Sequence, residues 1–434
     1  MRKIWRKNDL GSMALVPLSI AALVSLGVGI RHAIQYRCHD LQWLGARLVG
    51  QRIDPWREYL EHFPHHIGYV SPPNYLHLLY LILLPLGLLN FETAALLWTG
   101  GTVCLSVVCV LLLRRLFNLD RFQTVLVLCL LWMSSPFRVV LEVGQMSFFE
   151  LFFLTVAYLA ASTALSGLSF GVSLVKYSFS PAAGLLFLFR GRFRFLLYAA
   201  AVPLIGLFVV WLFVRTPLLR LALEPLAVSA SPTAVSPGFA DLMTLVEHTI
   251  KTYTTFARPR QIAYMVGLFG SAAYALLLSR FRLSRSAEFT LISIASLFFV
   301  THLVYDYVFL AVPLCFALTQ KSMKIKGLLI SFILTFWFIL PLFERKWQND
   351  PNIHLGQLAV NCGLLAIFLA FITSLVTTAA GHASESPRAQ HGSLHEDMKP
   401  ALKQFDSSIC LFFWGASGQL WRNYKRSNTS SRLA

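Results

Sequence analysis

Four ionisable side chains lie in or beside apolar stretches, where a charge needs a partner or a function. Asp40 follows the first apolar segment, Lys176 lies within a later one, and His302 and Asp306 precede another. A carboxylate held near a membrane surface can take the proton of a hydroxyl, which accelerates a reaction by roughly 10²- to 10⁴-fold. A lysine inside an apolar segment costs about 2.5–3.5 kcal/mol on insertion scales. We therefore expect Lys176 to face a cavity or a partner.

Each of these side chains also has a structural interpretation. Asp40 precedes three leucines at helical spacing, so it is suited to cap a short amphipathic helix on the membrane surface. Lys176 has a stem long enough to carry its ammonium to an interface. His302 and Asp306 are spaced to form a polar pair between helices. The local sequence leaves these alternatives open.

The elements that carry these residues are membrane helices. Of the 434 residues, 56% are hydrophobic and 13% are charged, whereas a soluble domain carries about 25% charged residues. This composition predicts an all-α polytopic membrane protein with about 10–13 transmembrane helices of roughly 20 residues each. Apolar segments occur at about 13–30, 74–89, 92–113, 122–141, 147–165, 167–189, 194–214, 261–279, 287–303, 305–319, 327–343 and 355–379.

The net charge of +17 does not indicate nucleic-acid binding, because the basic residues form short clusters between apolar segments. We assign these clusters to the cytoplasm, together with the N-terminus and the tail after residue 381. The long polar stretches 31–73 and 215–260 then lie outside. We expect residues 1–380 to form one membrane domain with these two outer loops, and residues 381–434 to form a flexible cytoplasmic tail.

Two apolar segments, 74–89 and 167–189, present a problem of parity. If each crosses the membrane once, the arginines between 114 and 121 fall outside, against the positive-inside rule. Pro85 and Pro181 favour broken helices within these segments. We favour re-entrant pairs of half-helices that enter and leave on the same side, and a single crossing by each segment is the alternative.

The sequence has no pattern typical of a metal site or a disulfide framework. His62, His65 and His66 crowd the first outer loop, but their spacing matches no metal motif. The seven cysteines lie mostly in apolar segments and include no CxxC pair. We therefore predict no metal ligands and expect no cofactor, and we leave a requirement for a divalent metal open.

A series of short motifs extends over about residues 36–315. The motifs are Asp40, Ala46-Arg47, Gly50, Asp54-Pro55, Tyr69 with Pro72-Pro73, Gly144-Gln145, Gly167 and Gly171 leading to Lys176, and His302 with Tyr305-Asp306. In this order the motifs resemble those of glycosyltransferase family 87. Ser147, Tyr177 and Trp56 stand where the family usually has Asn, Pro and Tyr.

The resemblance implies a GT-C-like bundle whose outer loops carry the active site. It implies a hexosyltransferase that moves a sugar, mannose by family resemblance, from a polyprenyl-phosphate donor to a lipid or glycan acceptor at the outer face. It assigns the catalytic base to Asp40, which suits an inverting single displacement. The residues that it implies for substrate binding are Arg47, Asp54, Tyr69, Gln145, Lys176, His302 and Asp306.

The expected partners are the sugar donor, the acceptor and membrane lipids, with no nucleic acid. The family implies the inner or plasma membrane of a bacterium. A transporter or flippase of lipid-linked sugars is the alternative from another class, because it would use Lys176, His302 and Asp306 as a polar pathway. A polysaccharide polymerase or ligase is a second enzymatic alternative.

Overall fold

The computed structural model describes residues 2–35, 42–62, 72–231, 238–342 and 351–385, and every regular element in these ranges is a helix. The prediction of an all-α polytopic membrane protein is confirmed. Asp40, Tyr69 and the tail after residue 385 lie outside the described residues. The chain divides into two compact units, 1–280 with 284–365 and 281–283 with 366–434, and the site described below lies within the first unit.

The helices, in chain order, are α1 (Arg2–Gln35), α2 (Gln42–Gly50), α3 (Pro55–His62), α4 (His77–Ile82), α5 (Leu84–Gly87), α6 (Phe91–Phe117), α7 (Arg121–Met133), α8 (Ser135–Val143), α9 (Ser147–Leu159), α10 (Thr163–Ser173), the short 3₁₀ turn η1 (Tyr177–Phe179), α11 (Ser180–Phe189), α12 (Phe193–Val214), α13 (Leu218–Ala230), α14 (Leu242–Tyr253), α15 (Pro259–Ser279), α16 (Arg285–Phe299), η3 (Val304–Leu310), α17 (Ala311–Thr319), α18 (Met323–Leu334), η4 (Thr335–Ile339) and α20 (Pro351–Glu385).

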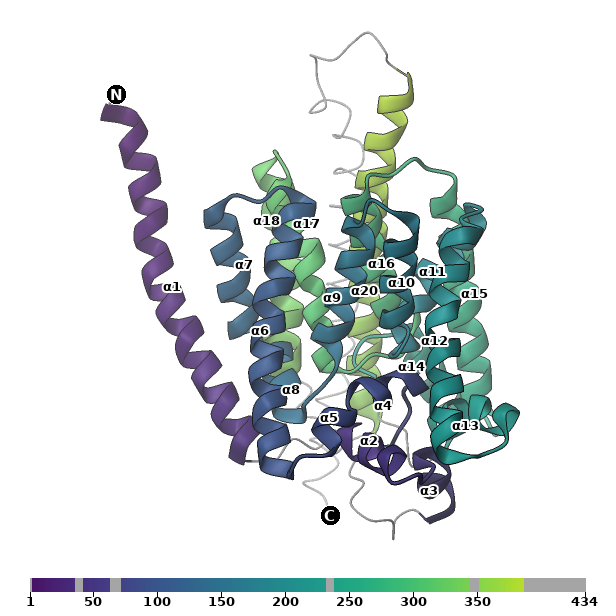
Figure 1. Ribbon diagram of the computed structural model, residues 1–434. Helices are drawn as coiled ribbons and strands as arrows, with labels where there is room; N and C mark the ends of the chain where they lie inside the picture. The colour runs from purple at the N-terminus through teal and green to yellow at the C-terminus, as the bar shows by residue number, and fades with distance from the viewer. Residues whose placement is uncertain (1, 36–41, 63–71, 232–237, 343–350, 386–434) are drawn as a thin grey trace, which may run out of the picture. The chain divides into compact units, whose positions relative to one another are not determined.

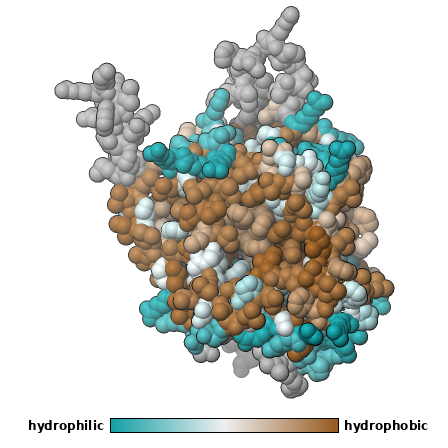
Figure 2. Space-filling view, in the orientation of Figure 1, coloured by the Kyte–Doolittle hydropathy of each residue, from teal (hydrophilic) through white to brown (hydrophobic). Residues whose placement is uncertain are grey.

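Six of the described helices are long and apolar enough to cross a membrane, and the number rises to eight if each of two bent pairs is one span. This is fewer than the sequence predicted, because several apolar segments are interrupted. Helix α9 has 13 residues and α16 has 15, which is short for a hydrocarbon core. The face shown in Figure 2 carries a broad band of hydrophobic residues between hydrophilic residues at either end. Leu197 and Leu204 of α12, 70% and 61% exposed, are examples of side chains suited to face lipid.

The two segments predicted to be broken are broken. Segment 74–89 forms α4 and α5, which meet at Leu83, and Pro85 lies in the first turn of α5. Segment 167–189 is bent by 118° between α10 and the η1–α11 run. Because this bend exceeds a right angle, α11 runs back towards the end at which α10 begins (Figure 1). That path is the one expected of a re-entrant pair.

Small residues allow α10 to lie close against α12. A Cβ atom added at Gly171 would stand 2.5 Å from the carbonyl oxygen of Ala199, and one added at Gly167 would stand 2.6 Å from that of Phe195. Both positions therefore require glycine for this approach. The close packing fixes the bent segment beside α12 and so fixes the position of the break.

One break was not predicted. Helices α7 and α8 are bent by 60° around Ser134, whose hydroxyl accepts a hydrogen bond from the Phe137 amide, and Pro136 lies in the first turn of α8. A serine cap followed by proline is a sequence signal for a helix start. The chain then turns at Gly144, which has φ +80°, and enters α9.

Candidate active site

Three interruptions of the helices meet at one buried polar cluster. They are the start of α9 at Ser147, the break between α10 and η1 at Lys176, and the stretch from His302 to Asp306, which ends in the first turn of η3. The cluster formed by Ser147, Lys176, His302 and Asp306 is buried. Interrupted helices leave backbone groups without intrahelical partners, so polar side chains are accommodated at such places within a membrane protein.

Asp306 is the centre of this cluster. Lys176 forms an ion pair with Oδ1 of Asp306, and the Ser147 hydroxyl donates a 2.7 Å hydrogen bond to the same oxygen. Nδ1 of His302 lies 2.9 Å from Oδ2 of Asp306. Lys176 also donates to the Ser147 hydroxyl at 3.4 Å and lies 4.8 Å from the ring centroid of Tyr305. The carboxylate therefore holds the lysine and the imidazole in fixed positions.

The structure thus unites three of the residues singled out in the sequence, Lys176, His302 and Asp306. Lys176 is buried against a carboxylate and does not extend to an interface. Ser147 completes the cluster although sequence reasoning noted it only as a departure from the family motif. The position of Ser147, two residues after Gln145 at the start of an apolar helix, was the available signal.

The backbone break at Lys176 is tied to the first broken segment. The Val175 carbonyl accepts a 3.0 Å hydrogen bond from the amide of Leu76, just before α4. The Tyr75 hydroxyl donates a 2.9 Å hydrogen bond to Oε1 of Gln145, and both side chains are buried. Gln145 therefore links the start of α9 to the chain entering α4. The two segments predicted to be re-entrant meet beside the polar cluster.

Helix α2, in the first outer loop, is hydrogen-bonded to α4 and to the end of α5. Oε1 of Gln42 accepts a 3.2 Å hydrogen bond from the Tyr80 hydroxyl of α4. Arg47 donates to the Gly87 carbonyl at 2.8 Å and to the Leu89 carbonyl, so its guanidinium stabilises the C-terminal end of α5. The contacts described for Arg47 are structural ones. They hold α2, which follows residue 41 directly, against α5.

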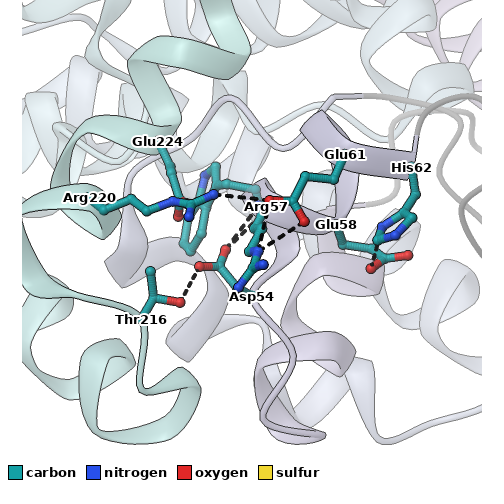
Figure 3. Close-up of polar contacts among 9 residues, drawn as sticks. Asp54, Arg57, Glu58, Glu61, His62, Thr216, Arg220 and Glu224 are labelled. Atoms are coloured by element: carbon teal, nitrogen blue, oxygen red, sulfur yellow. Dashed lines mark hydrogen bonds and ion pairs between the residues drawn. The ribbon is translucent and has the colours of Figure 1, made fainter.

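Asp54 joins the two outer loops (Figure 3). It accepts 3.1 Å hydrogen bonds from the amides of Trp56 and Arg57, and so caps α3. Its other oxygen accepts a 2.6 Å hydrogen bond from the hydroxyl of Thr216, which precedes α13. The Glu224 carboxyl of α13 lies beside Asp54. Burial, and then the Asp54 carboxylate, raise the pKa of Glu224 to about 7.

Arg220 extends this contact between the loops. It donates to Glu224 at 3.1 Å and to Glu61 of α3 at 3.1 Å. We call Asp54, Glu61, Thr216, Arg220 and Glu224 the outer-loop clasp. Of these five residues, sequence reasoning named only Asp54 as a candidate. Arg220 and Glu224 could have been found from their helical i,i+4 spacing in an otherwise apolar stretch.

The second outer loop is also hydrogen-bonded to the backbone of His302. Asp241 caps α14 by accepting a 2.7 Å hydrogen bond from the Thr244 amide, and the His302 amide donates to Asp241 at 3.5 Å. In return the Phe239 amide donates to the His302 carbonyl at 2.9 Å. Burial raises the pKa of Asp241 to about 7. Sequence reasoning missed Asp241, although its Asp-x-x-Thr spacing before α14 is typical of a helix cap.

A second carboxyl group lies near the polar cluster. Glu150 is buried one turn beyond Ser147 in α9 and interacts electrostatically with Lys176 and Asp306. Its Oε2 atom has no hydrogen-bond partner among the described residues. Within the same described residues, no group of three or more His, Cys, Asp or Glu side chains is placed to hold a metal ion.

Broken apolar helices that bring a lysine, a histidine and an aspartate together beneath two linked loops define the site of a polytopic membrane protein. The sequence profile of glycosyltransferase family 87 matches residues 75–313, more than half of the chain. The chain belongs to glycosyltransferase family 87. It is therefore a multi-pass membrane glycosyltransferase that takes a sugar donor and an acceptor. No curated protein and no solved structure matched.

The matched region includes part of the candidate site. Gln145, Lys176, His302 and Asp306 lie inside residues 75–313, and the first outer loop with Asp40, Arg47, Asp54 and Tyr69 precedes them. The family assignment does not give roles to individual residues. The polar cluster is thus a property of the structure that coincides with the matched part of the chain.

Proposed function

We propose that the protein transfers a hexose, mannose by the family resemblance, from a polyprenyl-phosphate carrier to a lipid or glycan acceptor at the outer face of the membrane. The observation that carries this proposal is the buried cluster of Ser147, Lys176, His302 and Asp306 at the junction of three helix breaks. A lipid-linked sugar presents a polar phosphate at the end of an apolar chain. A polar cluster buried among apolar helices matches that combination.

The proposed reaction is a single displacement with inversion. The acceptor hydroxyl attacks the anomeric carbon, the bond between that carbon and the phosphate oxygen breaks, and polyprenyl phosphate leaves with the bonding electrons. Asp40 takes the proton of the attacking hydroxyl. Asp306 orients Lys176 and the His302 imidazole towards the phosphate on which charge builds.

We further propose that the enzyme lies in the inner or plasma membrane of a bacterium, with its N-terminus and its C-terminal tail in the cytoplasm. Support comes from the basic residues at the ends of several helices. Helices α6, α11 and α15 end on the same side of the first unit in Figure 1, and each end carries or precedes arginines. The outer loops lie on the opposite side, where the acceptor would be reached.

The first test is transfer of radiolabelled mannose from synthetic polyprenyl-phosphate-mannose in membranes that contain the wild-type chain. We expect label in a membrane product from the wild type, and loss of at least about 10²-fold in the rate of Asp40→Asn, since removing a general base costs roughly 10²- to 10⁴-fold. Glu58→Gln, in the same loop but paired with His62 outside the polar cluster, is the matched control.

The two results test different parts of the proposal. Full activity of Asp40→Asn would contradict its role as the base, while leaving the donor correct. Absence of transfer by the wild type would contradict mannose as the sugar, and other polyprenyl-phosphate hexoses would be tried next. Repeating the wild-type reaction in EDTA decides whether a divalent metal takes part. Movement of intact lipid-linked sugar without transfer would favour the flippase alternative.

A further inference from the structure

A second group of polar side chains surrounds Tyr177, the residue after Lys176. Arg260, the second residue of α15, donates a 3.2 Å hydrogen bond from Nε to the Tyr264 hydroxyl and lies 5.6 Å from the ring centroid of Tyr264. Tyr177 interacts electrostatically with Arg260 and Tyr264. Residues from η1 and α15 therefore meet directly beside the helix break.

The guanidinium of Arg260 is only partly used in this arrangement. Its Nη1 atom is enclosed and has no hydrogen-bond partner among the described residues. An enclosed donor without a partner costs about 1–3 kcal/mol, and more when it is charged. Such a donor indicates a place for an acceptor that the protein itself does not supply.

The charges around the break point to the same place. The ammonium of Lys176 is neutralised by Asp306, and farther along, Arg190 is neutralised by Glu288. Arg260 makes no ion pair with a carboxylate in the part of the chain that the structure describes. Arg260, which interacts electrostatically with Tyr177, is therefore a cation whose charge is available to an anion. A guanidinium is also well suited to phosphate, because its planar fork of donors matches two phosphate oxygens.

The surroundings place Arg260 near the outer surface of the membrane. The stretch that leads into α15 exposes Tyr253 (74%) and Phe256 (65%), and aromatic side chains of this kind gather at the level of lipid headgroups. The phosphate of a lipid-linked sugar lies at that same level. Tyr177 stands where the family motif usually has proline, so its hydroxyl is a feature of this chain.

We propose that Arg260, with the hydroxyls of Tyr177 and Tyr264, binds the phosphate of the lipid-linked sugar donor next to the Lys176 cluster. This inference rests on the proposed function, because it assigns one part of the same donor. Arg260 adds positive charge at the phosphate to that of Lys176, whose ammonium is paired with Asp306.

The test is a titration of polyprenyl-phosphate-mannose with the full chain reconstituted in nanodiscs. Arg260→Gln should raise the donor KM by about 10-fold or more with a smaller change in kcat, because the contact is made to the bound donor before transfer. Tyr177→Phe should raise KM by a smaller factor. Arg260→Lys keeps the charge and should lie between Arg260→Gln and the wild type. Arg258→Gln is the matched control, since Arg258 is exposed and lies two residues away.

Equilibrium binding separates this inference from the proposed function. Polyprenyl phosphate without a sugar should bind the wild type and Arg258→Gln, and should bind Arg260→Gln about 10-fold more weakly. This loss of binding would support the phosphate site even if the wild type transferred no mannose. Equal binding by Arg260→Gln and Arg258→Gln would overturn it.

Phosphatidylglycerol in the nanodiscs identifies the source of the phosphate. If it displaces polyprenyl phosphate at equal concentration, Arg260 binds an ordinary headgroup and the assignment to the donor is wrong. If Arg260→Gln does not fold, Arg260→Lys and Tyr177→Phe decide the matter. Wild-type values for KM and binding in both of these variants would contradict the proposal.

Discussion

At the scale of single residues, the polar cluster depends on the pairing of Lys176 with Asp306. Breaking one partner of a buried ion pair costs about 3–5 kcal/mol, because the other charge is left buried without compensation. The Ser147 hydroxyl donates to the same carboxylate, and a hydrogen bond to a charged group contributes about 1.5–3 kcal/mol. Loss of the ion pair should therefore cost more than loss of the hydroxyl.

We predict that Asp306→Asn lowers the free energy of unfolding by about 3–5 kcal/mol and Ser147→Ala by a smaller amount, about 1.5–3 kcal/mol. Thermal unfolding in detergent measures both. The double variant Lys176→Met with Asp306→Asn should recover part of the loss, because neither charge then remains buried. An Asp306→Asn variant as stable as Ser147→Ala would contradict the pairing described for Asp306.

Sequence reasoning located ionisable residues of this cluster but not its geometry. Lys176, His302 and Asp306 are conspicuous because an ionisable group in an apolar segment is costly. The other three residues, Ser147, Glu150 and Asp241, are not conspicuous in the sequence. Serine is common in helices, Glu150 lies in the first turn of a helix, and Asp241 is an ordinary helix cap. Their importance arises from contacts between segments far apart in the chain, and local patterns contain no information on such contacts.

At the scale of the elements, the outer-loop clasp connects α3 with α13 through two adjacent carboxyl groups. Asp54 and Glu224 lie together, with Arg220 and Glu61 beside them. The pKa of Glu224 in the folded protein, about 7, lies above its ordinary value of 4.5. A raised pKa means that the folded state binds the proton more tightly than the unfolded state. The contribution of Glu224 to stability is therefore fully present below pH 4.5 and is lost as the pH rises through about 7.

We predict that Glu224→Gln removes this pH dependence, because an amide has the shape of the protonated carboxyl and does not titrate. The wild type should lose on the order of 1–3 kcal/mol relative to Glu224→Gln between pH 5 and pH 8. Unfolding temperatures of both proteins across this range measure the difference. Asp241, whose pKa is also raised, titrates in both proteins and cancels in the comparison.

Glu58→Gln is the control, since Glu58 is paired with His62 on α3 outside the clasp. Its unfolding temperature should follow that of the wild type at each pH. Parallel curves for the wild type and Glu224→Gln would show that Glu224 does not hold a proton at neutral pH. The clasp would then be held by Thr216 and Arg220 alone.

The breaks in the helices could be predicted where proline or charge parity signalled them. Pro85 and Pro181 marked the first and second segments. The arginines at the end of α6 required an even number of crossings between themselves and the basic N-terminal tail. The 60° bend between α7 and α8 was missed, although Ser134 and Pro136 form a start signal. The apolar character on both sides of that signal made the two helices look like one span.

At the scale of the whole molecule, the path of segment 167–189 decides which loops share a side of the membrane. A chain that enters and leaves on one side keeps residues 160–162 and 190–194 together. It also keeps the basic clusters in the cytoplasm and both long loops outside, as the positive-inside rule requires. A single crossing would separate residues 160–162 from residues 190–194. The bend of 118° favours the first path.

We predict that Ala161→Cys and Arg194→Cys, made in a cysteine-free background, react with an impermeant maleimide only after the cells are permeabilised. Thr255→Cys, in the stretch between α14 and α15, should react in intact cells. All three positions are exposed in the structure, so accessibility within the protein does not limit the reaction. Labelling of Ala161→Cys and Arg194→Cys from opposite sides would establish a single crossing. Lys176 would then belong to a spanning helix instead of the turn of a re-entrant pair. If Ala161→Cys were the position labelled in intact cells, the arginines at the end of α6 would face outwards.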